Sequence, residues 1–168
     1  MKNILILIFV FALFNASAQD MTVDKLGSIL KESADKIEGE NGRWQFQINE
    51  TVFVVLTDAN NNRMRIISPI AETISLEKHM LEKALIANFH SALDVKYAIS
   101  EGVIWSAFVH PLKELSEEQV KDAISQVYYA NVNFGTTYAS TSLIFPGKSA
   151  NDEIKEKEKK VKAKLRKT

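Results

Sequence analysis

The chain of 168 residues contains no cysteine and only three prolines and six glycines. The absence of cysteine excludes disulfide bonds, thiol catalysis and thiolate zinc sites. The scarcity of proline and an apolar content of 46% are typical of a compact domain rather than of a disordered chain. A chain of this size buries roughly two-thirds of its unfolded surface, so we expect its stability to come from a hydrophobic core.

Long apolar runs are also scarce, except at the N-terminus. Residues 4–14 are all apolar, but a helix needs about 20 such residues to cross a bilayer, which argues against the alternative of a membrane anchor. Lys2 precedes the run, and Ala16-Ser17-Ala18 follows it with the small-x-small pattern of a signal peptidase site. We therefore predict that residues 1–18 are a signal peptide cleaved before Gln19. The mature chain is then exported to the periplasm or the extracellular space, without a transmembrane segment.

Neither sign of charge is in excess over the whole chain, but the charges are unevenly distributed. Residues 19–147 hold 11 basic and 17 acidic side chains, whereas residues 148–168 hold 9 basic and 4 acidic ones. We interpret 19–147 as one acidic domain and 148–168 as a charged basic tail, solvated or in weak contact with an anionic surface. An exported, acidic body argues against nucleic acid as a partner.

Hydrophobic periodicity divides the middle of the chain into helices and strands. Apolar side chains at three- and four-residue spacing predict helices, and alternation predicts strands joined by turns such as Glu101-Gly102. The order α-β-β-β-α-β-β-α predicts a two-layer α+β sandwich, an antiparallel sheet with helices on one face. The predicted helices are 22–38, 75–91 and one that begins at Ser116, and the predicted strands are 43–48, 51–57, 63–67, 95–99 and 103–109.

Four segments carry more detailed predictions. Ser116 and Gln119 have the spacing of a capping box, and Ser75 is placed to cap the helix before it. Strand 51–57 is so uniformly apolar that we expect it to be covered on both faces. Residues 136–145 fit either an irregular extension of the last helix or a short added strand. The helix that starts at Ser75 carries a broad apolar stripe, formed by Leu76, Met80, Leu81, Ala84, Leu85 and Phe89.

No motif for catalysis, metal binding or cofactor binding is present. The histidines, His79, His90 and His110, lack the four-residue spacing of a metal-binding helix. Gly147-Lys148-Ser149 resembles the end of a phosphate loop, but Ser142 stands where that loop requires glycine. We therefore predict a protein that is not an enzyme and has no cofactor.

Four segments together resemble the type III secretion chaperones and the related YbjN-like family. They are Ala84–Phe89, Leu93–Ile99, the strand end Val109-His110-Pro111-Leu112, and the helix start Leu115–Val120. The resemblance spans roughly residues 22–135. It implies a non-enzymatic protein that holds another polypeptide, often as a homodimer. The export leader and basic tail depart from the secretion chaperones and point to an envelope relative with a different client.

Aromatic residues supply the candidate contacts. Trp105 and Phe108 lie at an odd offset on one strand and must face opposite sides of the sheet. Tyr128 and Tyr129 are consecutive on a helix and cannot both be fully buried on one face. One member of each pair is thus a candidate contact with a client or a second copy.

The sequence therefore predicts an exported protein-binding module of the cell envelope, chaperone-like or adaptor-like. The alternative is a small-molecule or lipid carrier, or an unrecognised envelope hydrolase, with a pocket between helices and sheet. A deep, enclosed apolar pocket with convergent polar groups would favour that alternative, and an open surface would favour protein binding.

Overall fold

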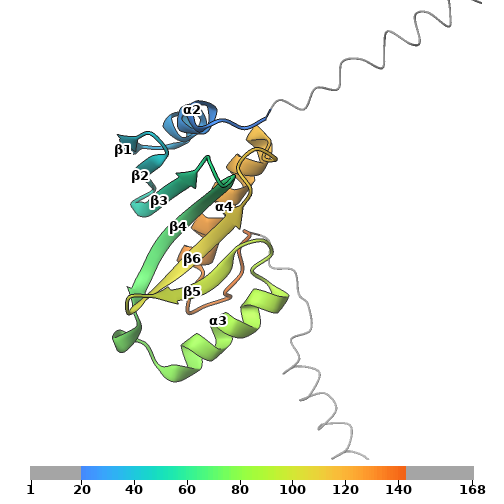
Figure 1. The fold of residues 1–168 in the computed structure, drawn as a ribbon. Coiled ribbons are helices and arrows are strands. Elements are labelled where there is room, and N and C mark those ends of the chain that lie inside the picture. The colour runs from blue at the N-terminus through green and yellow to red at the C-terminus, as the bar shows by residue number, and fades with distance from the viewer. Residues whose placement is uncertain (1–19, 143–168) are drawn as a thin grey trace, which may run out of the picture.

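A computed structural model describes residues 20–142, so the predicted signal peptide and basic tail lie outside the described residues. These residues form one six-stranded antiparallel sheet in the order β1-β2-β3-β4-β6-β5, with three α-helices (Figure 1). The predicted two-layer α+β class is confirmed, and the predicted order is present with one further edge strand, β1. The elements are α2 (Val23–Ser33), β1 (Lys36–Glu40), β2 (Arg43–Ile48), β3 (Thr51–Asp58), β4 (Arg63–Glu72), the 3-10 turn η1 (Thr73–Ser75), α3 (Lys78–His90), β5 (Lys96–Ser100), β6 (Val103–His110) and α4 (Glu117–Val132).

The first helix is shorter than its predicted range of 22–38. It begins after Thr22, whose hydroxyl accepts a hydrogen bond from the Lys25 N–H, and it ends at Ser33. The following residues form β1, which pairs with β2 through a tight turn at Asn41-Gly42. Both turn residues have positive φ, 53° and 87°, which is the backbone of a two-residue type I′ hairpin. The Asn-Gly pair was thus a hairpin signal, although the predicted helix ran almost up to it.

The core lies between one face of the sheet and the helices α2 and α4. Phe46 and Phe53 stack on adjacent strands with their ring centroids 4.7 Å apart. Trp44 lies beside Gly27 of α2, where a side chain would have no room, because a β-carbon there would be 2.9 Å from the indole ring. The tightest packing of α2 on the sheet thus depends on a residue without a side chain. The largest fully buried side chains include Leu26, Leu30, Phe46, Phe53, Met64, Ile66, Ile104, Val120 and Val127.

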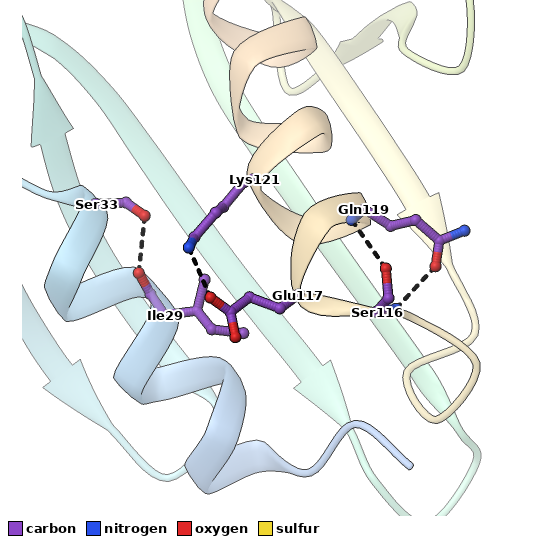
Figure 2. Close-up of polar contacts among 6 residues, drawn as sticks. All are labelled: Ile29, Ser33, Ser116, Glu117, Gln119 and Lys121. Atoms are coloured by element: carbon purple, nitrogen blue, oxygen red, sulfur yellow. Dashed lines mark hydrogen bonds and ion pairs between the residues drawn. The ribbon is translucent and has the colours of Figure 1, made fainter. Parts of the chain in front are cut away.

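Helix α4 begins with the predicted capping box. The Ser116 hydroxyl accepts a hydrogen bond from the Gln119 N–H, and the Gln119 side chain accepts one from the Ser116 N–H (Figure 2). Lys121 pairs with Glu117 one turn apart. The capping box is worth about 1 kcal/mol, since it satisfies two N–H groups that the first turn leaves without partners.

Polar side chains tie α4 to the strands beneath it. The Asn131 amide donates to the Ser68 hydroxyl at 2.7 Å and to the Pro69 carbonyl at 2.8 Å. Ser68 in turn donates to the Val52 carbonyl at 2.6 Å. The contact lies where the pairing of β4 with β6 shifts register between Pro69 and Ala71. These bonds join α4, β4 and β3 at the irregular point of the sheet.

The second face of the sheet is open in the described part of the chain. Phe53 and Val55 of β3 are fully buried, but Val52, Val54 and Leu56 on the other side are only half-buried. The prediction that this strand is covered on both faces is therefore wrong. Both α2 and α4 lie on the same side of the sheet, and α3 lies beyond its β5 edge (Figure 1).

The start of α3 and the segment after α4 also differ from the prediction. Ser75 does not cap α3; it belongs to η1, its hydroxyl donates to the Glu72 carbonyl, and α3 starts at Lys78 without a side-chain cap. After α4, residues 133–142 form turns, neither an extension of the helix nor a strand, and residues 143–147 lie outside the described residues. Of the helices in the described ranges, none has the length and apolar content needed to cross a membrane.

Candidate protein-binding surface

The apolar stripe of α3 points largely away from the core. Only Ala84 and Ala87 of this helix are buried. Leu85 is 68% exposed and Phe89 is 88% exposed, although the sequence places both on the predicted stripe. Burying a side chain of this kind is worth about 1.5–3 kcal/mol, so their exposure leaves that free energy unused in the isolated chain. Exposed apolar side chains clustered on one element indicate a surface for association.

Strand β5 continues this apolar surface at the edge of the sheet. Ile99 is 58% exposed and lies beside a shallow groove of about 170 Å³ between α3 and β5. We call the region formed by Leu81, Leu85, Ile86, Phe89 and Ile99 the α3–β5 surface. The groove itself is lined by Leu81, Ala84, Leu85, Tyr97, Ala98, Ile99 and Ile104.

Asn88 holds α3 at the sheet edge. Its amide nitrogen donates to the Tyr97 carbonyl at 3.1 Å, and its amide oxygen accepts from the Tyr97 N–H at 2.7 Å. The Tyr97 hydroxyl donates to the Ala130 carbonyl of α4 at 2.8 Å. Burial, and to a smaller extent the neighbouring Tyr138, raises the pKa of Tyr97. Since its backbone and side chain are both anchored, Tyr97 links α3, β5 and α4, and the exposed residues of α3 stand on a fixed support.

The predicted contact residues are divided between different surfaces. Trp105 is half-buried on the open face of the sheet, whereas Phe108 faces α4 and is only 7% exposed. The two therefore lie on opposite faces, as predicted, and Phe108 lies in the core. Tyr128 and Tyr129 are both half-buried on α4, with their rings 5.3 Å apart. The structure does not bring Trp105 together with the tyrosines, and the contacts of these residues with a partner stay predictions.

Sequence reasoning did not single out Leu85, Phe89 and Ile99 as contacts. Apolar spacing on a helix indicates which side chains share a face, but not whether another element covers that face. A weak sign existed in the sequence, because the helix also carries Ile86 outside the predicted stripe, and its apolar residues extend around more of its circumference than one packed face needs.

Two acidic side chains at the surface, Asp58 and Glu114, are hydrogen-bonded to asparagines. A hydrogen bond from the Asn62 amide lowers the pKa of Glu114, and the hydrogen bonds from Asn61 lower that of Asp58. Within residues 20–142, no group of three or more histidine, aspartate or glutamate side chains is arranged to hold a metal ion. A hollow of about 690 Å³ beside the start of α4 is lined mainly by charged side chains. The apolar groove is smaller than the 300–1,000 Å³ that ligand pockets typically have.

The comparisons with known proteins give a fold but no close relative. No protein-family model matches the chain, and no curated protein sequence matches it either. The chain is similar to a solved structure of the HopA1–SchA chaperone–effector complex, with a TM-score of 0.51 and 14% identity over 67% of this chain and 88% of the other.

A second solved structure is the Yersinia pestis type III secretion chaperone SycH in complex with a stable fragment of YscM2. It matches with a TM-score of 0.52 and 15% identity over 67% of this chain and 98% of the other. These likenesses support the predicted resemblance in its fold, while the YbjN-like relationship stays a prediction. The described domain has the fold of a type III secretion chaperone.

Proposed function

We propose that this protein is a non-enzymatic, chaperone-like module that binds polypeptides, and that two copies associate through the α3–β5 surface. The observation that carries the proposal is the outward direction of Leu85 and Phe89 on a helix whose backbone is fixed to the sheet edge by Asn88. Apolar residues on a fixed support lose little conformational entropy on association, which favours a specific contact.

The shape of the surface favours a macromolecular partner over a small ligand. The groove between α3 and β5 is shallow and of about 170 Å³, and much of the apolar area lies outside it, on the exposed side of α3. A carrier of lipids or small molecules needs a cavity that encloses most of its ligand. The structural neighbours support the same reading, since both are chaperones solved in complex with another polypeptide.

The place of action is part of the proposal. Residues 1–18 have the composition of a signal peptide, so we propose that the protein works outside the cytoplasm, in the periplasm or beyond, with an envelope client. N-terminal sequencing of the protein recovered from an expressing bacterial culture tests this directly. A mature chain that begins at Gln19 supports export, and a chain that keeps residues 1–18 overturns it.

Self-association is tested by size-exclusion chromatography with light scattering on the full chain. We expect twice the monomer mass for the wild type and the monomer mass for Phe89→Glu, because a charge at the centre of an apolar contact opposes its burial. Lys83→Glu is the matched control, since it alters an exposed residue of the same helix outside the apolar surface. A wild type that stays monomeric overturns the homodimer. If Phe89→Glu keeps the dimer mass, as the control Lys83→Glu should, the contact lies elsewhere.

Polypeptide binding is tested separately, by selection from a library of random linear peptides on the immobilised full chain. Enrichment of a recurring pattern of residues supports the proposal. If no peptide is enriched above the immobilisation support alone, the chaperone-like function is wrong.

A further inference from the structure

We infer that the open face of the sheet is the client-docking surface and that it takes an acidic amphipathic polypeptide segment. This inference rests on the proposed polypeptide-binding function and names the chemistry of the client. It concerns the face opposite α2 and α4, not the α3–β5 surface. We call it the arginine face, and it is formed by Arg43, Val54, Leu56, Arg63, Arg65, Ile67, Trp105, Ala107 and Val109.

Strand register places arginines and apolar residues in one row across the sheet. Arg43 of β2 is paired with Leu56 of β3, Leu56 with Arg65 of β4, and Arg65 with Val109 of β6. Residues paired across strands point to the same face, so these four side chains stand next to one another. Arg43 and Arg65 are two strands apart, which corresponds to roughly 10 Å. Arg63, two residues before Arg65, lies on the same face.

The next rows along the strands are apolar on β3, β4 and β6, with Gln45 of β2 and Lys96 of β5 at the two sides of the first of them. Val54 is paired with Ile67, and Ile67 with Ala107. One row further, Trp105 is paired with Pro69 of β4 on one side. These five side chains are half-buried, and no described helix or strand packs above them: Val54, Ile67, Pro69, Trp105 and Ala107. The arginine face therefore has a basic end and an apolar end, separated by roughly 13 Å along the strands.

The charge of this face contrasts with that of the remaining domain. Strand register assigns five basic and four acidic side chains to it. The rest of residues 19–147 then holds six basic and thirteen acidic side chains. All the arginines of the described residues, Arg43, Arg63 and Arg65, are in this group, which consists of Lys36, Arg43, Arg63, Arg65 and Lys96 with Glu38, Glu40, Asp58 and Glu72.

Arg43, Arg63 and Arg65 form no ion pair with any other side chain of residues 20–142. Among residues 20–142, the ion pairs are Lys78–Glu82, His79–Glu77 and Lys121–Glu117, and none includes an arginine. A guanidinium matches a carboxylate in a two-pronged hydrogen-bonded pair. Arginine and tryptophan are also the residues that most often dominate binding at interfaces. A client that fits this face offers carboxylates to the arginines and apolar side chains to Ile67 and Trp105. Such a client is an acidic amphipathic segment. A second copy would instead present a face of the same net sign.

The test extends the peptide selection. Peptides enriched on the wild-type full chain should carry aspartate or glutamate next to apolar residues. The most enriched peptide is then synthesised in two forms, as selected and with each acid changed to its amide. We expect the amide form, or the Arg65→Glu protein with the selected form, to bind about tenfold more weakly or worse. Lys31→Glu is the control, because it makes the same change of net charge on α2, in the opposite layer.

A spectroscopic measurement locates the peptide. Trp105 is half-buried and Trp44 is buried, so acrylamide quenching of the tryptophan fluorescence reports mainly on Trp105. The bound peptide should protect it, and Arg63→Glu, a second exposed variant, should weaken that protection. Peptides that bind without acidic enrichment and without sensitivity to Arg65→Glu would overturn this inference while leaving the polypeptide-binding function intact. No enrichment at all would overturn both.

Two other occupants have their own outcomes. Vesicles of phosphatidylglycerol that bind the wild type but not Arg65→Glu, and that displace the selected peptide, would assign the face to an anionic membrane and overturn the inference. A loss of the wild-type dimer in Arg65→Glu, with the dimer retained in Phe89→Glu, would assign the face to a second copy and overturn it as well.

Discussion

Replacing Asn131 with alanine should weaken the attachment of the end of α4 to the sheet and destabilise the domain. The substitution removes two hydrogen bonds, to the Ser68 hydroxyl at 2.7 Å and to the Pro69 carbonyl at 2.8 Å. Each such bond is worth about 1 kcal/mol, and acceptors left without a donor in a buried place add to the loss. Alanine recovers roughly 0.5 kcal/mol as the better helix former. The free energy of unfolding should therefore fall by about 2 kcal/mol.

Chemical denaturation followed by circular dichroism measures this loss, and a double-mutant cycle assigns it. Ser68→Ala should also be destabilising, since the Ser68 hydroxyl donates to the Val52 carbonyl. The double variant should lose about 1 kcal/mol less than the sum of the single losses, because the Asn131–Ser68 bond is removed only once. Asn60→Ala, in the exposed turn after β3, is the control and should change stability by less than about 0.5 kcal/mol. A loss of that small size for Asn131→Ala, or strictly additive losses, would refute the reasoning.

Three further predictions concern other parts of the domain. Gly27→Ala should destabilise the fold by about 1–2 kcal/mol in thermal or chemical denaturation, because the new methyl group meets the Trp44 ring and outweighs the gain in helix propensity. Tyr97→Phe should remove part of the fall in stability at alkaline pH. The raised pKa means that the unfolded tyrosine ionises first, near pH 10, so that the wild type loses stability as the pH rises from there towards the folded pKa. Asn62→Ala should raise the pKa of Glu114 towards its ordinary value in an NMR titration, since the lost amide donor stabilises the carboxylate.

Each of these predictions has a contrary outcome. Lys31→Ala on the exposed side of α2 controls for helix propensity, and a Gly27→Ala protein more stable than it would show that the indole ring moves aside at little cost. An alkaline stability profile unchanged in Tyr97→Phe would mean that another group governs it. An unchanged Glu114 titration in Asn62→Ala would show that the amide does not hold the carboxylate in solution.

The layers of the fold could be predicted from the sequence because local patterns and tertiary structure agree there. The alternation of Trp44 and Phe46, and the capping box at Ser116, describe elements whose buried faces meet the core as expected. Strand β1 was missed for a physical reason. Val23 to Ile37 satisfies a helical period almost as well as a helix followed by a strand. The sequence signal for the strand is the Asn41-Gly42 pair, whose positive φ angles form the hairpin turn.

The candidate site was less accessible to sequence reasoning. Apolar side chains at Leu85, Phe89 and Ile67 are as compatible with a core as with an interface, because period indicates a shared face but not its cover. The arginine face was hidden for a related reason. Arg43 and Arg65 are far apart in sequence and come together only through the register of three strands, with Leu56 between them. Pairing partners of this kind follow from the assembled sheet.

The amide of Asn88 occupies the outer rim of β5 at Tyr97, where a foreign strand would otherwise add. The Asn88 side chain opposes the pairing of a further strand with β5, because the N–H and the carbonyl of Tyr97 are already hydrogen-bonded to it. If the protein binds unfolded polypeptides, as we propose, a free sheet edge beside them would invite strand addition and aggregation. Because Asn88 blocks this part of the β5 edge, the protein can expose apolar side chains there while strand addition to its sheet is opposed.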